Sequence, residues 1–261
     1  MIEARGLAKR YGRFTAVHPM DLHVRPGELF GFLGPNGAGK TTTIRMIAGV
    51  LRPSEGTVIV AGHDIVRDPR RAKSSIGYIP DRPFLYEKLT GAEFLRFVGG
   101  LWRKDGEELE HRIDELLELF DLAEWKHSLV ESYSHGMRQK LLISAALVHN
   151  PDVIVVDEPM VGLDPRGARL IKELLRAFVA RGGTVFLSTH TLEVAEALCD
   201  RIAIIQGGRI RALGTMNELR AEAAAGSAGL EDIFLKLTGG EAVSELLGSL
   251  RGPATAESVP R

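Results

Sequence analysis

The chain has 261 residues, of which 44% are apolar and 26% charged, so it has the length and composition of one or two globular domains with a sizeable core. Its net charge of −1 gives no overall electrostatic reason to bind nucleic acid or an acidic membrane, and we expect no nucleic-acid partner. The single cysteine, Cys199, excludes disulfides within the chain, and the longest apolar segment, Leu141 to Val148, is far too short to cross a bilayer.

Residues 1–30 predict antiparallel strands, because polar and apolar residues alternate between the turn sequences Tyr11-Gly12 and Arg25-Pro26-Gly27. Tyr11 precedes a nucleotide-type motif and could stack on a purine base. The alternative is an ordinary aromatic residue that is half-buried in a strand.

Residues 28–50 read as a short buried strand, a glycine-rich loop and a helix, which is the order of a phosphate-binding P-loop. Backbone N–H groups can converge on a phosphate only where no side chain intervenes, so Gly34, Gly37 and Gly39 suit the turn. The positive end of the following helix points at the same anion. Lys40 would place a charge between the outer phosphates, and the Thr41 hydroxyl could ligate Mg²⁺.

Residues 53–56 predict a turn and residues 57–60 a strand, and a second short strand covers residues 75–79 before Pro80 stops it. Asp81 follows directly. A carboxylate at the end of a strand in a nucleotide site could hold water or Mg²⁺, although such an aspartate is more often a turn residue.

Residues 82–150 have a helical character. Glu107 to Leu122 form an amphipathic pattern whose apolar face comprises Leu109, Ile113, Leu116, Leu117 and Phe120. Ser134 precedes a helical run that includes the apolar segment from Leu141 to Val148. Ser134 is therefore predicted to be the N-cap of this helix, and the same helix start could bind an anion.

Residues 153–158 predict a fully buried parallel strand that ends in Asp157 and Glu158, at the edge where open α/β sheets bind ligands. Asp157 would belong to the Mg²⁺ shell, and Glu158 would polarise the attacking water. A turn at residues 162–165, a helix over about 167–180 and a strand over 184–189 follow. His190 ends that strand, where it can contact a terminal phosphate.

The remaining residues predict a hairpin over 201–213, a helix over 217–226 and a short amphipathic helix over 230–237. From residue 252 onward the residues are small and polar and include proline, a composition typical of disorder.

Taken together, residues 1–237 resemble the ATP-binding subunit of ABC transporters. A Walker A motif stands at Gly34 to Thr42, a Walker B motif at Val153 to Glu158, a D-loop at residues 162–165 and a switch histidine at His190. The resemblance implies an α/β P-loop NTPase fold, with a RecA-like parallel sheet, an antiparallel β subdomain and a helical subdomain over about 82–150. The cassette would span 1–220, and 221–261 would be a C-terminal extension.

By this resemblance, the nucleotide-binding residues are Tyr11, Gly34, Pro35, Asn36, Gly37, Ala38, Gly39, Lys40, Thr41, Thr42, Ser134 and Gly136. The catalytic residues are Glu158, His190 and Lys40, and the residues of the metal shell are Thr41, Asp81 and Asp157.

Two motifs depart from the family pattern. Asp81 replaces the usual glutamine, and an ionised carboxylate accepts hydrogen bonds but donates none. The signature reads Tyr133-Ser134-His135-Gly136-Met137 in place of Leu-Ser-Gly-Gly-Gln. Ser134 and Gly136 are kept, whereas His135 and Met137 are atypical.

The resemblance further implies a head-to-tail dimer, in which each signature closes over the partner's Mg²⁺–ATP, and separate membrane subunits that dock near Phe84-Leu85-Tyr86. The expected role is ATP-driven transport, with export favoured, at the cytoplasmic face of the cell membrane. An alternative is a soluble clamp on ribosomes or DNA. That reading is weaker because the chain has neither a second cassette nor a long coiled coil. A simple P-loop kinase is disfavoured because the Asp157-Glu158 pair suits attack by water.

Overall fold

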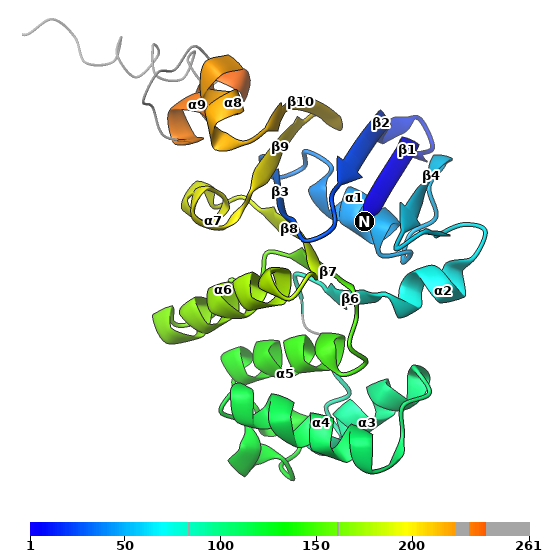
Figure 1. The fold of residues 1–261 in the computed structure, drawn as a ribbon, viewed down its shortest axis with the longest axis vertical. Coiled ribbons are helices and arrows are strands. Elements are labelled where there is room, and N and C mark those ends of the chain that lie inside the picture. Colours follow the sequence, from blue (N-terminus) through cyan, green and yellow to red (C-terminus); the bar gives the residue numbers. More distant parts are fainter. Residues whose placement is uncertain (83, 161, 223–229, 239–261) are drawn as a thin grey trace, which may run out of the picture.

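A computed structural model describes residues 1–82, 84–160, 162–222 and 230–238 of the chain. Within these ranges the polypeptide forms two sheets, with a group of helices, α3 to α5, below them (Figure 1). The prediction for residues 252–261 lies outside the described residues, as does the end of the helix predicted over 217–226. In the part of the chain that the structure describes, no helix combines the length and the apolar character needed to cross a bilayer.

The first sheet is antiparallel and has the strand order β2-β1-β4-β5. Its strands are β1 (Ile2–Tyr11), β2 (Phe14–Val24), β4 (Glu55–Val60) and β5 (His63–Asp64). The alternation of polar and apolar residues in the first 30 positions therefore predicted the antiparallel pairing correctly. A tight hairpin joins β1 to β2 and places Tyr11 directly opposite Phe14.

The second sheet has the order β10-β9-β3-β8-β7-β6, and its strands run parallel except for β10 at one edge. Its strands are β3 (Leu29–Leu33), β6 (Ile76–Ile79), β7 (Val153–Asp157), β8 (Thr184–Thr189), β9 (Arg201–Gln206) and β10 (Arg209–Gly214). Every residue of β3, β7 and β8 is buried, which explains the apolar runs at Leu29 to Leu33, Val153 to Val156 and Val185 to Leu187.

Helices cover both faces of this sheet (Figure 1). Helix α1 lies on the side of the antiparallel sheet, whereas α6 and α7 lie on the opposite side. The α-helices are α1 (Lys40–Ile47), α2 (Pro69–Ser74), α3 (Gly91–Leu101), α4 (Gly106–Leu119), α5 (His135–Leu147), α6 (Pro165–Ala180), α7 (Leu192–Leu198), α8 (Met216–Glu222) and α9 (Leu230–Thr238). Short 3₁₀ turns occupy Ala123–Trp125 and Val130–Ser132.

Two predicted helix boundaries were wrong by a few residues. Helix α4 ends at Leu119 instead of Leu122, because the chain turns into the left-handed region at Asp121 (φ 57°). Helix α6 begins at Pro165 instead of residue 167, because the Asp164 carboxylate accepts a hydrogen bond from the Gly167 N–H and proline is favoured in the first turn.

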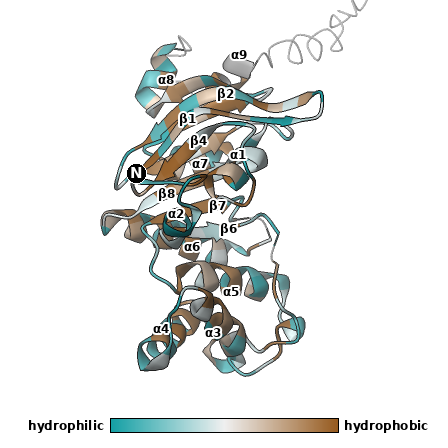
Figure 2. Ribbon diagram, turned by 90° about the vertical axis from the view of Figure 1, so that its right-hand side faces the viewer, coloured by the Kyte–Doolittle hydropathy of each residue, from teal (hydrophilic) through white to brown (hydrophobic). Residues whose placement is uncertain are grey.

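Helices α3, α4 and α5 pack together below the sheets, in an apolar cluster that continues to the parallel sheet and α6 (Figure 2). The apolar face predicted for α4 is buried there, together with Phe120. A capping box fixes the start of α3, in which Thr90 and Glu93 exchange backbone and side-chain hydrogen bonds. This unit carries the signature segment, which begins α5.

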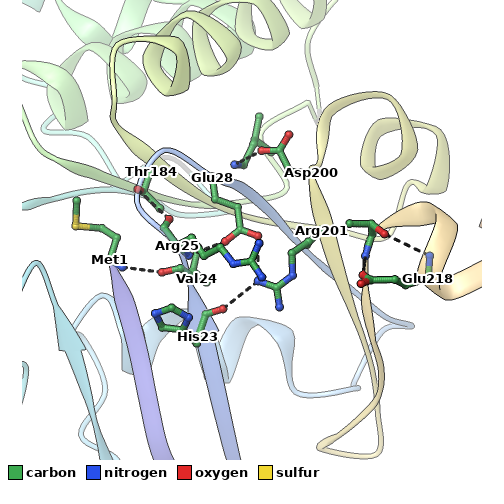
Figure 3. Close-up of polar contacts among 11 residues, drawn as sticks. Met1, His23, Val24, Arg25, Glu28, Thr184, Asp200, Arg201 and Glu218 are labelled. Carbon is green, nitrogen blue, oxygen red and sulfur yellow. Dashed lines mark hydrogen bonds and ion pairs between the residues drawn. The ribbon is translucent and has the colours of Figure 1, made fainter.

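A buried ion pair fixes the connection between the two sheets to β9 (Figure 3). Arg201 on β9 lies 3.1 Å from Glu28, and their side chains are only 14% and 6% exposed. The second Glu28 oxygen accepts the Arg25 N–H at 2.6 Å, and the amino group of Met1 donates to the Val24 carbonyl at 2.7 Å. These contacts fix the β2–β3 connection against β9, and so place the β1–β2 hairpin relative to the glycine loop.

Helices α8 and α9 pack against the edge of the parallel sheet and against α7. Leu230 and Ile233 of α9 are fully buried there, in one apolar cluster with Ile202 and Leu33. Leu33 is the last residue of β3, so this cluster supports the strand that leads directly into the glycine loop.

Candidate functional site

A cavity of about 640 Å³ lies beside the residues that follow β3, β6, β7 and β8, facing the β1–β2 hairpin. Its position agrees with the rule that ligands of open α/β sheets bind at the carboxyl ends of the strands. The lining residues are Tyr11, Phe14, Ala16, Asn36, Gly37, Gly39, Lys40, Thr41, Thr42, Asp81, Arg82, His135, Asp157, Glu158 and His190. Residues predicted from five separate parts of the chain therefore meet around one space.

The glycine loop is shaped by contacts that exclude side chains. A Cβ atom at Gly34 would lie 2.3 Å from the Ile205 carbonyl oxygen, and one at Gly39 would lie 2.8 Å from the Ala16 carbonyl oxygen. Gly39 also has a φ of 107° and is the N-cap of α1, where no side chain caps the helix. The free N–H groups at the start of α1 therefore point to the cavity end of the loop, which suits an anion.

The Lys40 ammonium is nearly buried and is folded back onto the loop. It donates to the carbonyl oxygens of Gly34 at 2.7 Å and of Pro35 at 3.3 Å. Burial lowers the pKa of Lys40, and the nearby carboxylates of Glu158 and Asp157 oppose that shift. An anion in the cavity would oppose it further, because it favours the charged ammonium.

Gly34, Pro35 and Ala38, also predicted as nucleotide contacts, are not among the residues that line the cavity, and the carbonyl oxygens of Gly34 and Pro35 accept hydrogen bonds from Lys40. The Ala38 carbonyl accepts the N–H of Gly208 at 2.9 Å. Gly208 braces the loop from the β9–β10 turn, and a Cβ there would lie 2.6 Å from the Ala16 carbonyl oxygen. The sequence predicted Gly208 only as part of a hairpin turn, and its contact with the glycine loop was not predicted.

Asp157 ends β7 and is almost fully buried. One carboxylate oxygen accepts the Ser188 hydroxyl at 2.7 Å, whereas the other is buried with no hydrogen-bond partner among the described residues. A buried carboxylate oxygen without a partner fits a cation. The described residues contain no cluster of three or more acidic, histidine or cysteine side chains that could hold a metal by themselves. A Mg²⁺ ion would therefore need Thr41, Asp81, water or a bound phosphate as further ligands, and Thr41 and Asp81 line the same cavity.

Glu158 and His190 form a direct pair at the cavity. The Glu158 Oε1 atom lies 2.7 Å from Nδ1 of His190, and Thr189 donates to the second carboxylate oxygen at 3.4 Å. Glu158 has a φ of 52°, a left-handed conformation that is uncommon for this residue type and occurs at functional sites. Its N–H donates to the Ser188 carbonyl at 3.0 Å, which fixes the turn after β7.

The signature segment starts α5. The Ser134 hydroxyl accepts the Met137 N–H at 3.3 Å, so the N-cap prediction is confirmed. Of the described residues that line the cavity, the signature contributes His135, while Ser134 and Gly136 lie outside the lining. The His135 ring lies against Gly162, where a Cβ would approach the ring Cδ2 and Nε2 atoms to 2.4 Å, and Gly162 has a φ of 78°. His135 thus connects α5 to the loop that follows Glu158.

Comparisons with known proteins agree with this geometry. The sequence profile of the family described as "ABC transporter" matches residues 17–161. The chain is 43% identical over 221 residues to the daunorubicin resistance ATP-binding protein DrrA3 of Streptomyces coeruleorubidus, spanning 85% of this chain and 70% of that protein. It is 40% identical over 219 residues to the Nod factor export ATP-binding protein I of Ralstonia nicotianae, spanning 84% of this chain and 68% of that protein.

One solved structure is described as the dimeric, post-hydrolysis state of the ATP-binding cassette MJ0796 bound to ADP and Pi. It superposes with a TM-score of 0.75 at 25% identity, covering 83% of this chain and 99% of that one.

Proposed function

The chain belongs to the ABC transporter family as an ATP-binding subunit, and we propose that it hydrolyses ATP in the cavity beside the glycine loop and so powers export through separate membrane subunits. One observation carries this proposal. Lys40, the partly unpartnered Asp157 and the Glu158–His190 pair line a single cavity at the start of α1.

Each group has a separate task in binding the nucleotide. The N–H groups at the start of α1 and the Lys40 ammonium bind the β- and γ-phosphates, and the Tyr11 ring stacks on the base. Mg²⁺ would be held by Asp157, Thr41 and Asp81, and when bound it supplies positive charge to the phosphate oxygens.

Glu158 acts as the general base, since its carboxylate is next to the phosphate end of the cavity and is oriented by His190. A water oxygen attacks the γ-phosphorus and passes its proton to Glu158. The bond from the γ-phosphorus to the bridging oxygen breaks, and ADP leaves with that electron pair. His190 positions Glu158 and contacts the γ-phosphate.

The signature points to a dimer. Ser134 and Gly136 lie outside the lining of the chain's own cavity. The Ser134 hydroxyl oxygen accepts the Met137 N–H, while its hydrogen and the Gly136 N–H can donate to the γ-phosphate held by a second copy. The MJ0796 cassette, whose structure is described as dimeric, supports a dimer here as well. In a head-to-tail pair, each nucleotide lies between the glycine loop of one copy and the signature of the other.

The link to a membrane subunit rests on exposed aromatic residues after β6. Phe84 is 92% exposed and Tyr86 is 59% exposed. Such an apolar surface beside Asp81 suits docking of a cytoplasmic helix from the membrane subunit, which would hold the chain at the inner face of the membrane. The relatives named for daunorubicin resistance and Nod factor export support outward transport, and neither supports a clamp on ribosomes or DNA.

The test is Glu158→Gln. We expect ATP to bind as in the natural chain, while phosphate release falls on the order of a hundredfold or more, because the amide cannot accept the proton from water. A closed dimer should accumulate with ATP in size-exclusion chromatography. Glu118→Gln, on the exposed face of α4, is the matched control and should behave like the natural chain. Near-normal phosphate release by the Glu158 variant would rule out this base.

A further inference from the structure

Two large aromatic side chains stand exposed at the tip of the β1–β2 hairpin. Tyr11 is 50% exposed and Phe14 is 65% exposed, and they are direct cross-strand neighbours. Both line the cavity that holds the glycine loop, and Ala16 continues the same wall. Neighbouring aromatic residues left in water usually mark a surface that contacts something else.

The Tyr11 and Phe14 rings do not stack on each other. Among the described residues, the aromatic ring contacts do not include a pair between Tyr11 and Phe14. One face of the Tyr11 ring is occupied, because the Lys9 ammonium lies 5.3 Å from the ring centroid while it donates to the Arg52 carbonyl. The other face of the Tyr11 ring and the apolar surface of Phe14 therefore remain available to contact a flat ligand group.

The cavity is chemically divided. The glycine loop and the ends of β7 and β8 supply the charged groups Lys40, Asp157 and Glu158, whereas the hairpin supplies Tyr11, Phe14 and Ala16. A nucleotide has the same division, with anionic phosphates at one end and a flat aromatic base at the other. The hairpin end therefore matches the base.

We propose that Phe14 is a second base-contacting residue, which together with Tyr11 forms an apolar slot for a purine ring. The inference rests on the proposed function, since it needs a nucleotide in this cavity. Apart from the Tyr11 hydroxyl, these hairpin side chains carry no hydrogen-bonding group. The slot therefore recognises a base by the area of its ring and not by hydrogen bonds to its edge. It should favour ATP and GTP over CTP and discriminate little between adenine and guanine.

The test compares Phe14→Ala with the natural chain by isothermal titration calorimetry against ATP, GTP, CTP and inorganic tripolyphosphate. We expect ATP and GTP to bind about tenfold more weakly, which is about 1.4 kcal/mol, because one stacking surface is lost. CTP should lose less, and tripolyphosphate, which has no base, should bind unchanged. Phe14→Tyr should restore ATP binding.

Two controls make the result specific. Phe97→Ala removes another exposed phenylalanine, on α3 and outside the cavity lining, and should leave all four affinities unchanged. Lys40→Ala should weaken tripolyphosphate as well as ATP. Thermal unfolding checks that each variant is folded, and Phe14→Leu, which keeps an apolar side chain but no ring, replaces the alanine variant if that variant does not fold.

Unchanged ATP affinity in Phe14→Ala, with loss in Lys40→Ala, would overturn the role of Phe14 and leave the nucleotide site intact. Equal losses for ATP and tripolyphosphate would also overturn it, because Phe14 would then act on the loop and not on the base. If the natural chain bound neither ATP nor tripolyphosphate, the proposed function itself would fail.

Discussion

His149 should make the chain lose stability in mild acid. It follows α5, and its ring stacks on Trp102 at the end of α3, with centroids 4.6 Å apart and an interplanar angle of 20°. Its Nε2 atom donates to the Ile76 carbonyl at 3.1 Å, while Nδ1 is buried with no partner among the described residues. A proton added to Nδ1 would place a charge where nothing accepts it.

The size of the effect follows from the pKa of His149. Burial lowers it from 6.5 to about 4, with a smaller lowering by Lys104 and an opposing effect of the Ile76 carbonyl. Between these two values the unfolded chain binds the proton and the folded chain does not, so stability falls as the pH falls through this window. The full loss is about 3 kcal/mol below the folded pKa, and about 2 kcal/mol should already be lost between about pH 7.5 and about pH 5.

The assay is urea unfolding of the natural chain and of His149→Phe at both pH values. The phenylalanine ring keeps the stacking on Trp102 and loses the hydrogen bond to Ile76, so it lowers stability by about 1 kcal/mol at either pH. Its acid-induced loss should be smaller than that of the natural chain by about 2 kcal/mol. His111→Gln, an exposed histidine on α4, should keep the natural pH dependence. If His149→Phe lost as much stability in acid as the natural chain, the unpaired Nδ1 would not be the cause.

Two further changes test the contacts that hold the site in place. Glu28→Gln should lower the free energy of unfolding in urea by about 3 kcal/mol, because Arg201 would keep a nearly buried charge without its partner, and a loss below about 1 kcal/mol would contradict the role of this ion pair. Gly162→Ala should reduce steady-state phosphate release, since the new Cβ meets the His135 ring in a left-handed backbone conformation. His135→Gly in the same chain should recover part of the rate; natural activity in Gly162→Ala alone would show that the contact does not constrain Glu158.

The strands could be predicted because burial dictates their composition. Parallel strands covered on both faces need mainly apolar residues, which fill β3, most of β7 and the middle of β8 from Val185 to Leu187. Their order in the sheet could not be predicted in the same way. Strand β3 lies between β8 and β9, which are more than 150 positions away along the chain, and no local pattern encodes such a pairing.

The site residues likewise divide into those that a local sequence pattern predicts and those that depend on contacts between distant segments. The glycine loop and the Asp157-Glu158 pair are local patterns with a local chemical reason, so the sequence was enough to propose them. Gly208 and Ser188 act through partners far away in the chain, and only the fold places them and Phe14 beside the cavity. The orientation of the Lys40 ammonium toward the loop carbonyls also depends on burial, which the sequence does not specify.

Two charged groups of the cavity, Lys40 and Glu158, have partners within the protein. Lys40 donates to two loop carbonyls and Glu158 pairs with His190, whereas one buried oxygen of Asp157 has no partner. A phosphate that binds the Lys40 ammonium must therefore replace the hydrogen bonds from Lys40 to the two carbonyl oxygens. The loss of these hydrogen bonds reduces the affinity for an anion alone. A triphosphate with a divalent cation offers an oxygen to Lys40 and a positive charge to Asp157 at once. Under the proposed function, a metal–nucleotide complex would satisfy both groups, whereas either component alone would satisfy only one.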